Sequence, residues 1–231
     1  MSGIADPAVP CLVRAGTRQG ALDGAPAWCS AGITGVLIPP PWQTDAPRHA
    51  RCDEQQPFVA QNADLSDVPG ETIASRIAST AAALRHHGLD CYLELRLDEV
   101  VCDAPTSTVD PGWLRALETD PALDPRLPRG TLRRRRLLEC PPAAFVQAWL
   151  ERLSMWLDHG IRGLILRSPE ALAPPIWHAL IHGLRVHHPD ALFIAWTPGM
   201  SPTALQVRRF SGFDHTVSSL AWWDGSADWL A

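Results

Sequence analysis

Residues 160–197 constrain the fold more than any other stretch, because short apolar runs there alternate with a helical pattern. One apolar run reads Gly160-Ile161-Arg162-Gly163-Leu164-Ile165-Leu166-Arg167, and a second reads Phe193-Ile194-Ala195-Trp196. Between them, Pro174 and Pro175 open a helix, because the first turn of a helix does not need their missing N–H groups. Two consecutive strand–helix units of this kind are typical of a parallel α/β fold.

The same alternation continues along the rest of the chain. Strands are expected at residues 11–14, 36–39, 91–97, 163–166, 192–196 and 213–217. A helix is expected at residues 72–87, where Ile73, Ile77 and Leu84 share a face, and it stops at Gly88. Another is expected at residues 143–159, which stops at Gly160 in the same way. Six strand–helix units are therefore expected, where a closed (β/α)8 barrel has eight.

Length and composition set the size of the fold. The 231 residues, 46% of them hydrophobic, can bury one substantial core and lie near the lower limit for a complete barrel. We therefore expect a single domain over residues 1–231. Two stretches break the alternation: residues 44–69, a long loop, and residues 102–142, an irregular insertion rich in Pro, Asp and Arg.

Charge and cysteine spacing exclude several functions. The net charge of −5 gives no general attraction to nucleic acid or to an anionic membrane. The six cysteines include no Cys-x-x-Cys pair, and His178 and His182 lack a third ligand, so no metal and no cofactor is expected. With neither a signal peptide nor an apolar run of spanning length, a cytoplasmic chain with reduced thiols is expected.

The motifs of residues 160–197 resemble the α-amylase superfamily, glycoside hydrolase family 13. In that family one strand carries Gly-x-x-Gly-Phe-Arg-x-Asp, which ends in the nucleophile, and the next carries Phe-x-x-Glu, which ends in the general acid. Aligned residue by residue, the nucleophile position is Arg167 and the acid position is Trp196. The Arg that precedes the nucleophile in the family is Ile165 here.

Two earlier runs carry the same resemblance. Residues 32–40 are similar to the family's second strand, and residues 88–99 are similar to its third. In the third strand, Glu94 stands at the family's Asp position, and Asp98 and Glu99 replace its Asn-His pair. Within the family, Pro169, residues 175–177 and residues 212–215 most resemble the maltosyltransferases that extend α-1,4-glucan from maltose 1-phosphate.

The resemblance implies an incomplete (β/α)8 TIM-type barrel without its expected catalytic groups. A retaining glycosidase needs two carboxyl groups about 5 Å apart, which neither a guanidinium nor an indole can replace. The implied function is a catalytically degenerate barrel in α-glucan metabolism that binds glucan or supports an active maltosyltransferase domain or subunit. The alternative is an active glycosidase or maltosyltransferase that uses displaced acids. The candidates for that role are Glu94, Asp98, Glu99 and Asp214.

Tryptophans are the remaining clue to a ligand. The chain has ten Trp beside a single Tyr. Trp149, Trp156 and Trp177 fall on apolar helix faces and are interpreted as core residues. Others follow or end strands, where a barrel presents its binding loops and flat rings could stack on the glucose units of an α-glucan or maltooligosaccharide. These candidate substrate-binding residues are Trp42, Trp196, Trp222 and Trp223.

Overall fold

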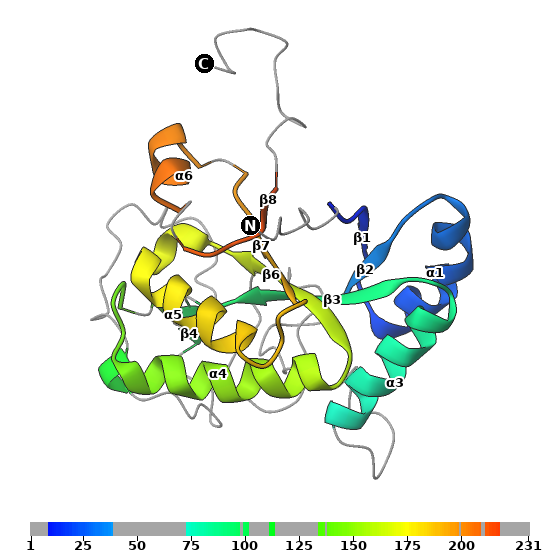
Figure 1. Cartoon of the computed structure of the whole chain (residues 1–231), viewed down its shortest axis with the longest axis horizontal. Helices are drawn as coiled ribbons and strands as arrows, with labels where there is room; N and C mark the ends of the chain where they lie inside the picture. Colours follow the sequence, from blue (N-terminus) through cyan, green and yellow to red (C-terminus); the bar gives the residue numbers. More distant parts are fainter. Residues whose placement is uncertain are drawn as a thin grey trace, which may run out of the picture.

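Apolar strands that are buried on both faces build the centre of this molecule, as a parallel sheet requires. In the structure, a computed structural model, six strands form one sheet in the order β1-β2-β3-β6-β7-β8, and every neighbouring pair is parallel (Figure 1). Their bounds are β1 Leu12–Arg14, β2 Gly35–Ile38, β3 Asp90–Arg96, β6 Ile161–Arg167, β7 Leu192–Ala195 and β8 His215–Thr216. All six predicted strands are therefore confirmed.

The structure describes residues 9–38, 73–97, 99–101, 111–113, 134–136, 138–198, 200–208 and 211–217. Within these ranges the helices are α1 Arg18–Ser30, α3 Ile73–His86, α4 Ala143–Asp158, α5 Pro174–Arg185 and α6 Pro202–Arg208. Two short 3-10 turns are η2 Pro111–Trp113 and η3 Pro169–Ala171. The alternation of strands and helices confirms an α/β fold with six strands in its main sheet.

The long helices form where the sequence places apolar residues at helical spacing. In α4 the buried residues are Phe145, Trp149, Leu153, Trp156 and Leu157. The helix ends before Gly160, which has a φ of 94°, a left-handed conformation that glycine adopts without a steric penalty. Helix α3 ends in the same way before Gly88, with a φ of 75°. The predicted helix ends are confirmed at both glycines.

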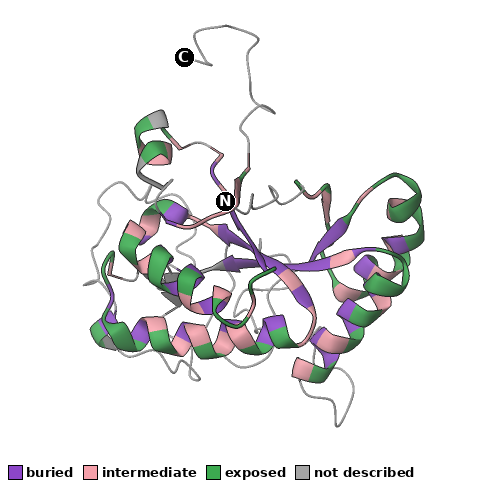
Figure 2. Cartoon of the chain, viewed as in Figure 1, coloured by how far each residue is buried: buried purple, intermediate pink, exposed green. Residues whose placement is uncertain are grey.

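The two faces of the sheet are packed by different sets of side chains. One face lies against helices α1, α3, α4 and α5 and holds the larger core, which includes Leu93, Leu166 and Phe193 (Figures 1 and 2). We call the opposite face the inner face. It holds a smaller cluster made of Leu37, Tyr92, Ile165, Leu192 and Ile194, against which Leu12, Trp196 and Val217 pack.

Some elements were not expected from the sequence. Helix α1 contains Pro26 and two glycines, yet Thr17 caps its first turn by accepting a 3.0 Å hydrogen bond from the Gly20 N–H. Helix α6 was not predicted either. Of the irregular insertion at residues 102–142, the structure describes η2, residues 138–142 and β5 Arg134–Arg136, which pairs antiparallel with β4 Glu99–Val101.

Candidate functional site

The inner face of the sheet changes from apolar to charged at the carboxyl ends of its strands. Because side chains alternate along a strand, Glu94 follows Tyr92 on the inner face and Arg167 follows Ile165 there. Arg14 likewise follows Leu12 at the end of β1. Parallel strands end at one edge of the sheet, so these three charged side chains come together there.

Glu94 is the centre of this group. Its side chain is only 4% exposed, and each of its two carboxylate oxygens accepts a hydrogen bond from an arginine. Arg14 Nε donates to Oε2 at 2.6 Å, and Arg167 Nη1 donates to Oε1 at 2.5 Å. Charge-assisted contacts of this length are the strong ones, and a buried carboxylate requires such partners. Two guanidiniums around one carboxylate leave the cluster with an excess of one positive charge.

Arg167 also lies over the ring of Trp196. Its guanidinium carbon is 4.7 Å from the centre of the indole, within the range of a cation–π contact. The backbone N–H of Trp196 donates to the Leu166 carbonyl at 2.9 Å, which places the backbone of Trp196 beside the end of β6. The side chains aligned with the family's nucleophile and acid therefore contact each other directly.

The turn after Arg167 is held in an uncommon conformation. Ser168 has φ and ψ of 50°, and it is the only residue other than glycine with positive φ in the described part of the chain. A left-handed serine costs about 1–2 kcal/mol. Local contacts hold this turn, because the Trp177 indole N–H donates to the Pro169 carbonyl at 2.7 Å and the Ala171 N–H donates to the Ser168 carbonyl at 3.0 Å.

Tyr92 lies one step deeper on the inner face, below Glu94. Burial raises the pKa of its phenol from 10.0 to about 12, and the charge of Asp90 adds to the rise. Tyr92 is paired across the sheet with Leu37 and Gly163, and its side chain is 2% exposed. An enclosed neutral phenol among apolar side chains is a packing element at neutral pH.

Of the four proposed displaced acids, the structure describes the side chains of Glu94 and Asp214, and it does not bring these two together. Asp214 immediately precedes His215, which pairs with Ile194 of the inner face, so Asp214 points to the helix side of the sheet. There it contacts Arg185 of α5. Glu94 lies on the inner face, so the sheet separates the two carboxylates. Asp98 lies outside the described residues, as does the side chain of Glu99.

The tryptophans named from the sequence fall into three groups: core residues, Trp196 at the cluster, and residues outside the described ranges. Trp149, Trp156 and Trp177 are at most 3% exposed, which confirms their interpretation as core residues. Trp196 is half-buried at the edge of the charged cluster. The other three strand-end candidates, Trp42, Trp222 and Trp223, lie outside the described residues.

Sequence reasoning missed Arg14. The first strand was identified only by its short apolar run, and its terminal Arg carried no motif. An arginine at the end of a strand is a weak signal by itself. It could have been found only by asking which cation would neutralise Glu94 once the third strand is buried in a sheet.

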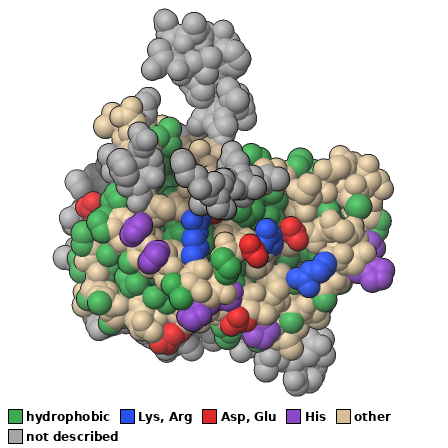
Figure 3. Space-filling view, in the orientation of Figure 1, with side chains coloured by type: hydrophobic (Ala, Val, Ile, Leu, Met, Phe, Trp, Pro, Cys, Tyr) green, Lys and Arg blue, Asp and Glu red, His purple; other side chains and the backbone are tan. Residues whose placement is uncertain are grey.

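The remaining features give no sign of a metal centre in the described part of the chain. His178 and His182 are exposed on α5 with parallel rings 5.8 Å apart, and no group of three or more His, Cys, Asp or Glu among the described residues could hold a metal ion. No described helix is long and apolar enough to cross a membrane. On the face shown in Figure 3, the charged side chains of the described residues lie in small groups.

The chemistry of the cluster follows from its partners. Both oxygens of Glu94 are engaged by cations, and Arg167 would repel an oxocarbenium-like transition state at the position that it occupies. Trp196 offers apolar ring area beside polar hydrogen-bond donors, a combination that suits a sugar ring.

Comparison with known proteins finds similarity both in sequence and in structure. No family model matches the chain. The chain is 31% identical over 174 residues to an alpha-1,4-glucan:maltose-1-phosphate maltosyltransferase of Burkholderia pseudomallei, which covers 71% of this chain and 15% of that protein. The chain therefore spans less than a sixth of the length of the curated relative that it matches.

The structural neighbours include α-amylases. The α-amylase of Geobacillus thermoleovorans, solved with acarbose, superposes with a TM-score of 0.68 at 12% identity, covering 92% of this chain and 50% of that one. An α-amylase of Lactobacillus plantarum gives a TM-score of 0.63 at 13% identity, covering 91% and 53%. About half of each enzyme chain is thus matched by the six-stranded sheet and its helices.

The sequence comparison and the structural comparison point to the same group of proteins. The sequence similarity to the maltosyltransferase covers 71% of this chain, and the superpositions place the sheet within TIM-barrel amylases. The predicted resemblance is therefore confirmed: the chain has the fold of an incomplete (β/α)8 barrel like that of α-amylases, and it is similar in sequence to a maltosyltransferase.

Proposed function

We propose that this chain is a catalytically degenerate α-amylase-type barrel that binds α-glucan at the carboxyl ends of its strands and supports an active maltosyltransferase domain or subunit. The observation that carries the proposal is the stacking of Arg167 on Trp196, with 4.7 Å between the guanidinium carbon and the ring centre. In the sequence, these residues align with the family's nucleophile and acid. Neither can supply covalent or acid catalysis.

Binding is the function that these replacements favour. An indole held at a strand end provides a flat apolar surface, while the arginines beside it provide N–H donors for hydroxyl groups. Arg14 is suited to this role, since its side chain is 47% exposed. The partner is proposed to be an α-glucan or maltooligosaccharide because the sequence relative is named for α-1,4-glucan. The cytoplasmic location expected from the sequence stays a prediction.

Titration with maltoheptaose tests the proposal. A Trp196→Ala protein should bind roughly five- to hundredfold more weakly than the unaltered chain, because a stacking Trp contributes on the order of 1–3 kcal/mol. Its melting temperature should change little. The matched control is Trp149→Ala, which empties a fully buried core position and should lower the free energy of unfolding by about 3–5 kcal/mol.

The opposite pattern would refute this assignment. If Trp196→Ala melts far lower and binds maltoheptaose as tightly as the unaltered chain, Trp196 is a core residue. The described part of the chain would then hold no evidence for a glucan site.

A further inference from the structure

We infer that Glu94 is a positioning residue for Trp196, because it holds Arg167 against one face of the indole and thereby limits sugar stacking to the opposite face. This inference rests on the proposed glucan-binding function and specifies how that site is organised. It assigns to Glu94, which sequence analysis considered as a displaced catalytic acid, a role that acts through Arg167.

The first step is the rigidity of Glu94. Its side chain is 4% exposed and lies on a strand that pairs on both sides, with β2 and with β6. Arg14 reaches it from β1, two strands away in the sheet, and engages Oε2. The carboxylate is therefore fixed by the sheet below it and by a cation on one oxygen. Only Oε1 remains for Arg167, which it meets at 2.5 Å.

The second step is the dependence of Arg167 on that contact. The side chain is long and has several rotatable bonds, so holding it in one arrangement costs conformational entropy. Arg167 is 22% exposed and ends its strand, next to the left-handed Ser168. The Glu94 carboxylate supplies a short charge-assisted bond that selects the conformation in which the guanidinium covers the indole.

The third step concerns the ring itself. A guanidinium 4.7 Å from the ring centre occupies one face of Trp196. A glucosyl ring that stacks on this indole must therefore use the other face. The site should take a single sugar ring against Trp196, with Arg167 setting the tilt of the indole from behind.

A double-mutant cycle on maltoheptaose affinity tests this chain of contacts. Glu94→Gln preserves the size of the side chain and removes the charge that orients Arg167. It should weaken binding about five- to twentyfold, as couplings between contacting residues do. The same substitution made in a Trp196→Ala protein should have little further effect, because the ring that Glu94 positions is gone. Additive losses in the double variant would overturn the inference.

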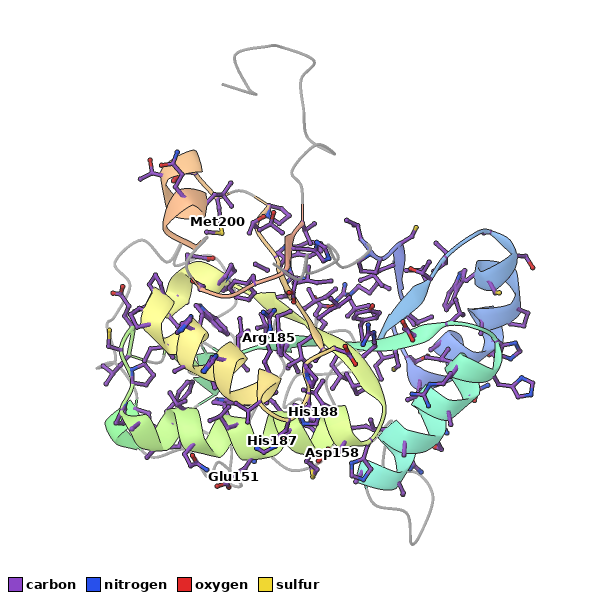
Figure 4. The ribbon with its side chains drawn as sticks, viewed as in Figure 1. Glu151, Asp158, Arg185, His187, His188 and Met200 are labelled. Carbon is purple, nitrogen blue, oxygen red and sulfur yellow. The ribbon has the colours of Figure 1, made fainter. Side chains whose placement is uncertain are left out.

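Two further variants separate positioning from general damage. Arg167→Lys keeps a positive charge beside Glu94 but loses the planar group that stacks, so it should weaken binding about as much as Glu94→Gln. The matched control is Glu151→Gln on the exposed surface of α4, labelled in Figure 4, which should leave affinity unchanged. Binding by Arg167→Lys at the unaltered affinity would contradict the role of stacking.

A measurement without ligand distinguishes failure of this inference from failure of the proposed function. The near-UV circular dichroism signal of Trp196 is obtained by subtracting the spectrum of Trp196→Ala from that of the unaltered chain. The same subtraction between Glu94→Gln and the double variant should give a different signal, while the far-UV spectrum of Glu94→Gln stays that of the unaltered chain. If the unaltered chain does not bind maltoheptaose, the proposed function and the sugar-facing part of the inference both fail. An unchanged difference spectrum shows that Glu94 does not position Trp196, whatever the chain binds.

Discussion

Arg185 at the end of α5 and Asp214 just before β8 form an ion pair in which Nη2 lies 2.5 Å from Oδ1. The other carboxylate oxygen accepts a 2.8 Å hydrogen bond from the backbone N–H of Phe193 on β7. Arg185 also donates to the Gly212 carbonyl at 3.2 Å. Figure 4 shows Arg185 extending from α5 toward the strands. Asp214 thus ties a helix, a neighbouring strand and its own turn together.

We expect Asp214→Ala to destabilise the fold without affecting glucan affinity. The carboxylate is 14% exposed and its loss leaves Arg185 and the Phe193 N–H without this partner, which should cost about 1–3 kcal/mol of unfolding free energy. Urea denaturation measures the change. Asp158→Ala is the control, because that side chain is 65% exposed and lies 3.7 Å from His188 (Figure 4). Lost affinity with unchanged stability would instead give Asp214 a functional role.

Gly163 is predicted to be essential for packing the centre of the sheet. A Cβ at this position would lie 2.4 Å from the Leu192 carbonyl oxygen and 2.9 Å from the Tyr92 ring. The first neighbour is a backbone atom of the adjacent strand, so it can move away only if the two strands separate. Gly163→Ala should therefore lower the free energy of unfolding by about 1–3 kcal/mol or more.

Gly16→Ala is the matched control for that substitution. A Cβ there meets nothing within 4 Å, so the same chemical change should leave stability within about 0.5 kcal/mol of the unaltered chain. Thermal melts of both variants compare them directly. Equal melting temperatures would show that the strands can separate at Gly163 without cost.

Much of the fold could be predicted because its elements are encoded locally. Short apolar runs between helical patterns gave all six strands of the sheet, and the spacing of Phe145, Trp149 and Leu153 gave α4. Helix α1 was missed because Pro26 and its glycines lower helix propensity, while the Thr17 cap and buried Ala21 and Ala25 compensate. Tertiary packing overrode the local signal there.

The candidate site was predictable only in part. The positions of Arg167 and Trp196 at strand ends follow from the motif, since the lengths of the runs fix where each strand stops. Their stacking and the bond to Glu94 depend on distances between strands, which no local pattern contains. Arg14 was missed for the same reason, because it meets Glu94 only after β2 has been placed between their strands.

Stability is expected to fall in alkaline solution because two buried groups resist ionisation. Burial raises the pKa of the Cys91 thiol from 9.0 to about 12, and that of Tyr92 from 10.0 to about 12. A group whose pKa is raised by folding stabilises the fold fully below its unfolded pKa. That contribution is lost as the pH rises toward the folded value. Melting temperature should therefore decline between about pH 9 and pH 12.

Cys91→Ala isolates one part of this decline. The variant loses packing at all pH values, but its slope above pH 9 should be shallower than that of the unaltered chain, because one titrating group has been removed. Thiol labelling at pH 8 provides an independent check. Cys11, Cys29 and Cys140 are exposed and should react in the native state, whereas Cys91 should react only after unfolding. Rapid native labelling of Cys91 would contradict its enclosure.

The last prediction is that the purified chain neither hydrolyses maltooligosaccharides nor transfers maltosyl units from maltose 1-phosphate. Covalent catalysis needs a nucleophile where Arg167 lies, and leaving-group protonation needs an acid where Trp196 lies. Glu94 cannot stand in for either, because both of its oxygens are bound by arginines and Asp214 lies across the sheet from it. Release of reducing ends and of phosphate should stay at the level of a protein-free blank.

Turnover well above that blank, abolished by Glu94→Ala or Asp98→Ala but retained in Glu151→Gln, would establish an enzyme with displaced acids. It would also require the Arg14–Glu94–Arg167 contacts to open during the reaction, since only then could the carboxylate reach a substrate.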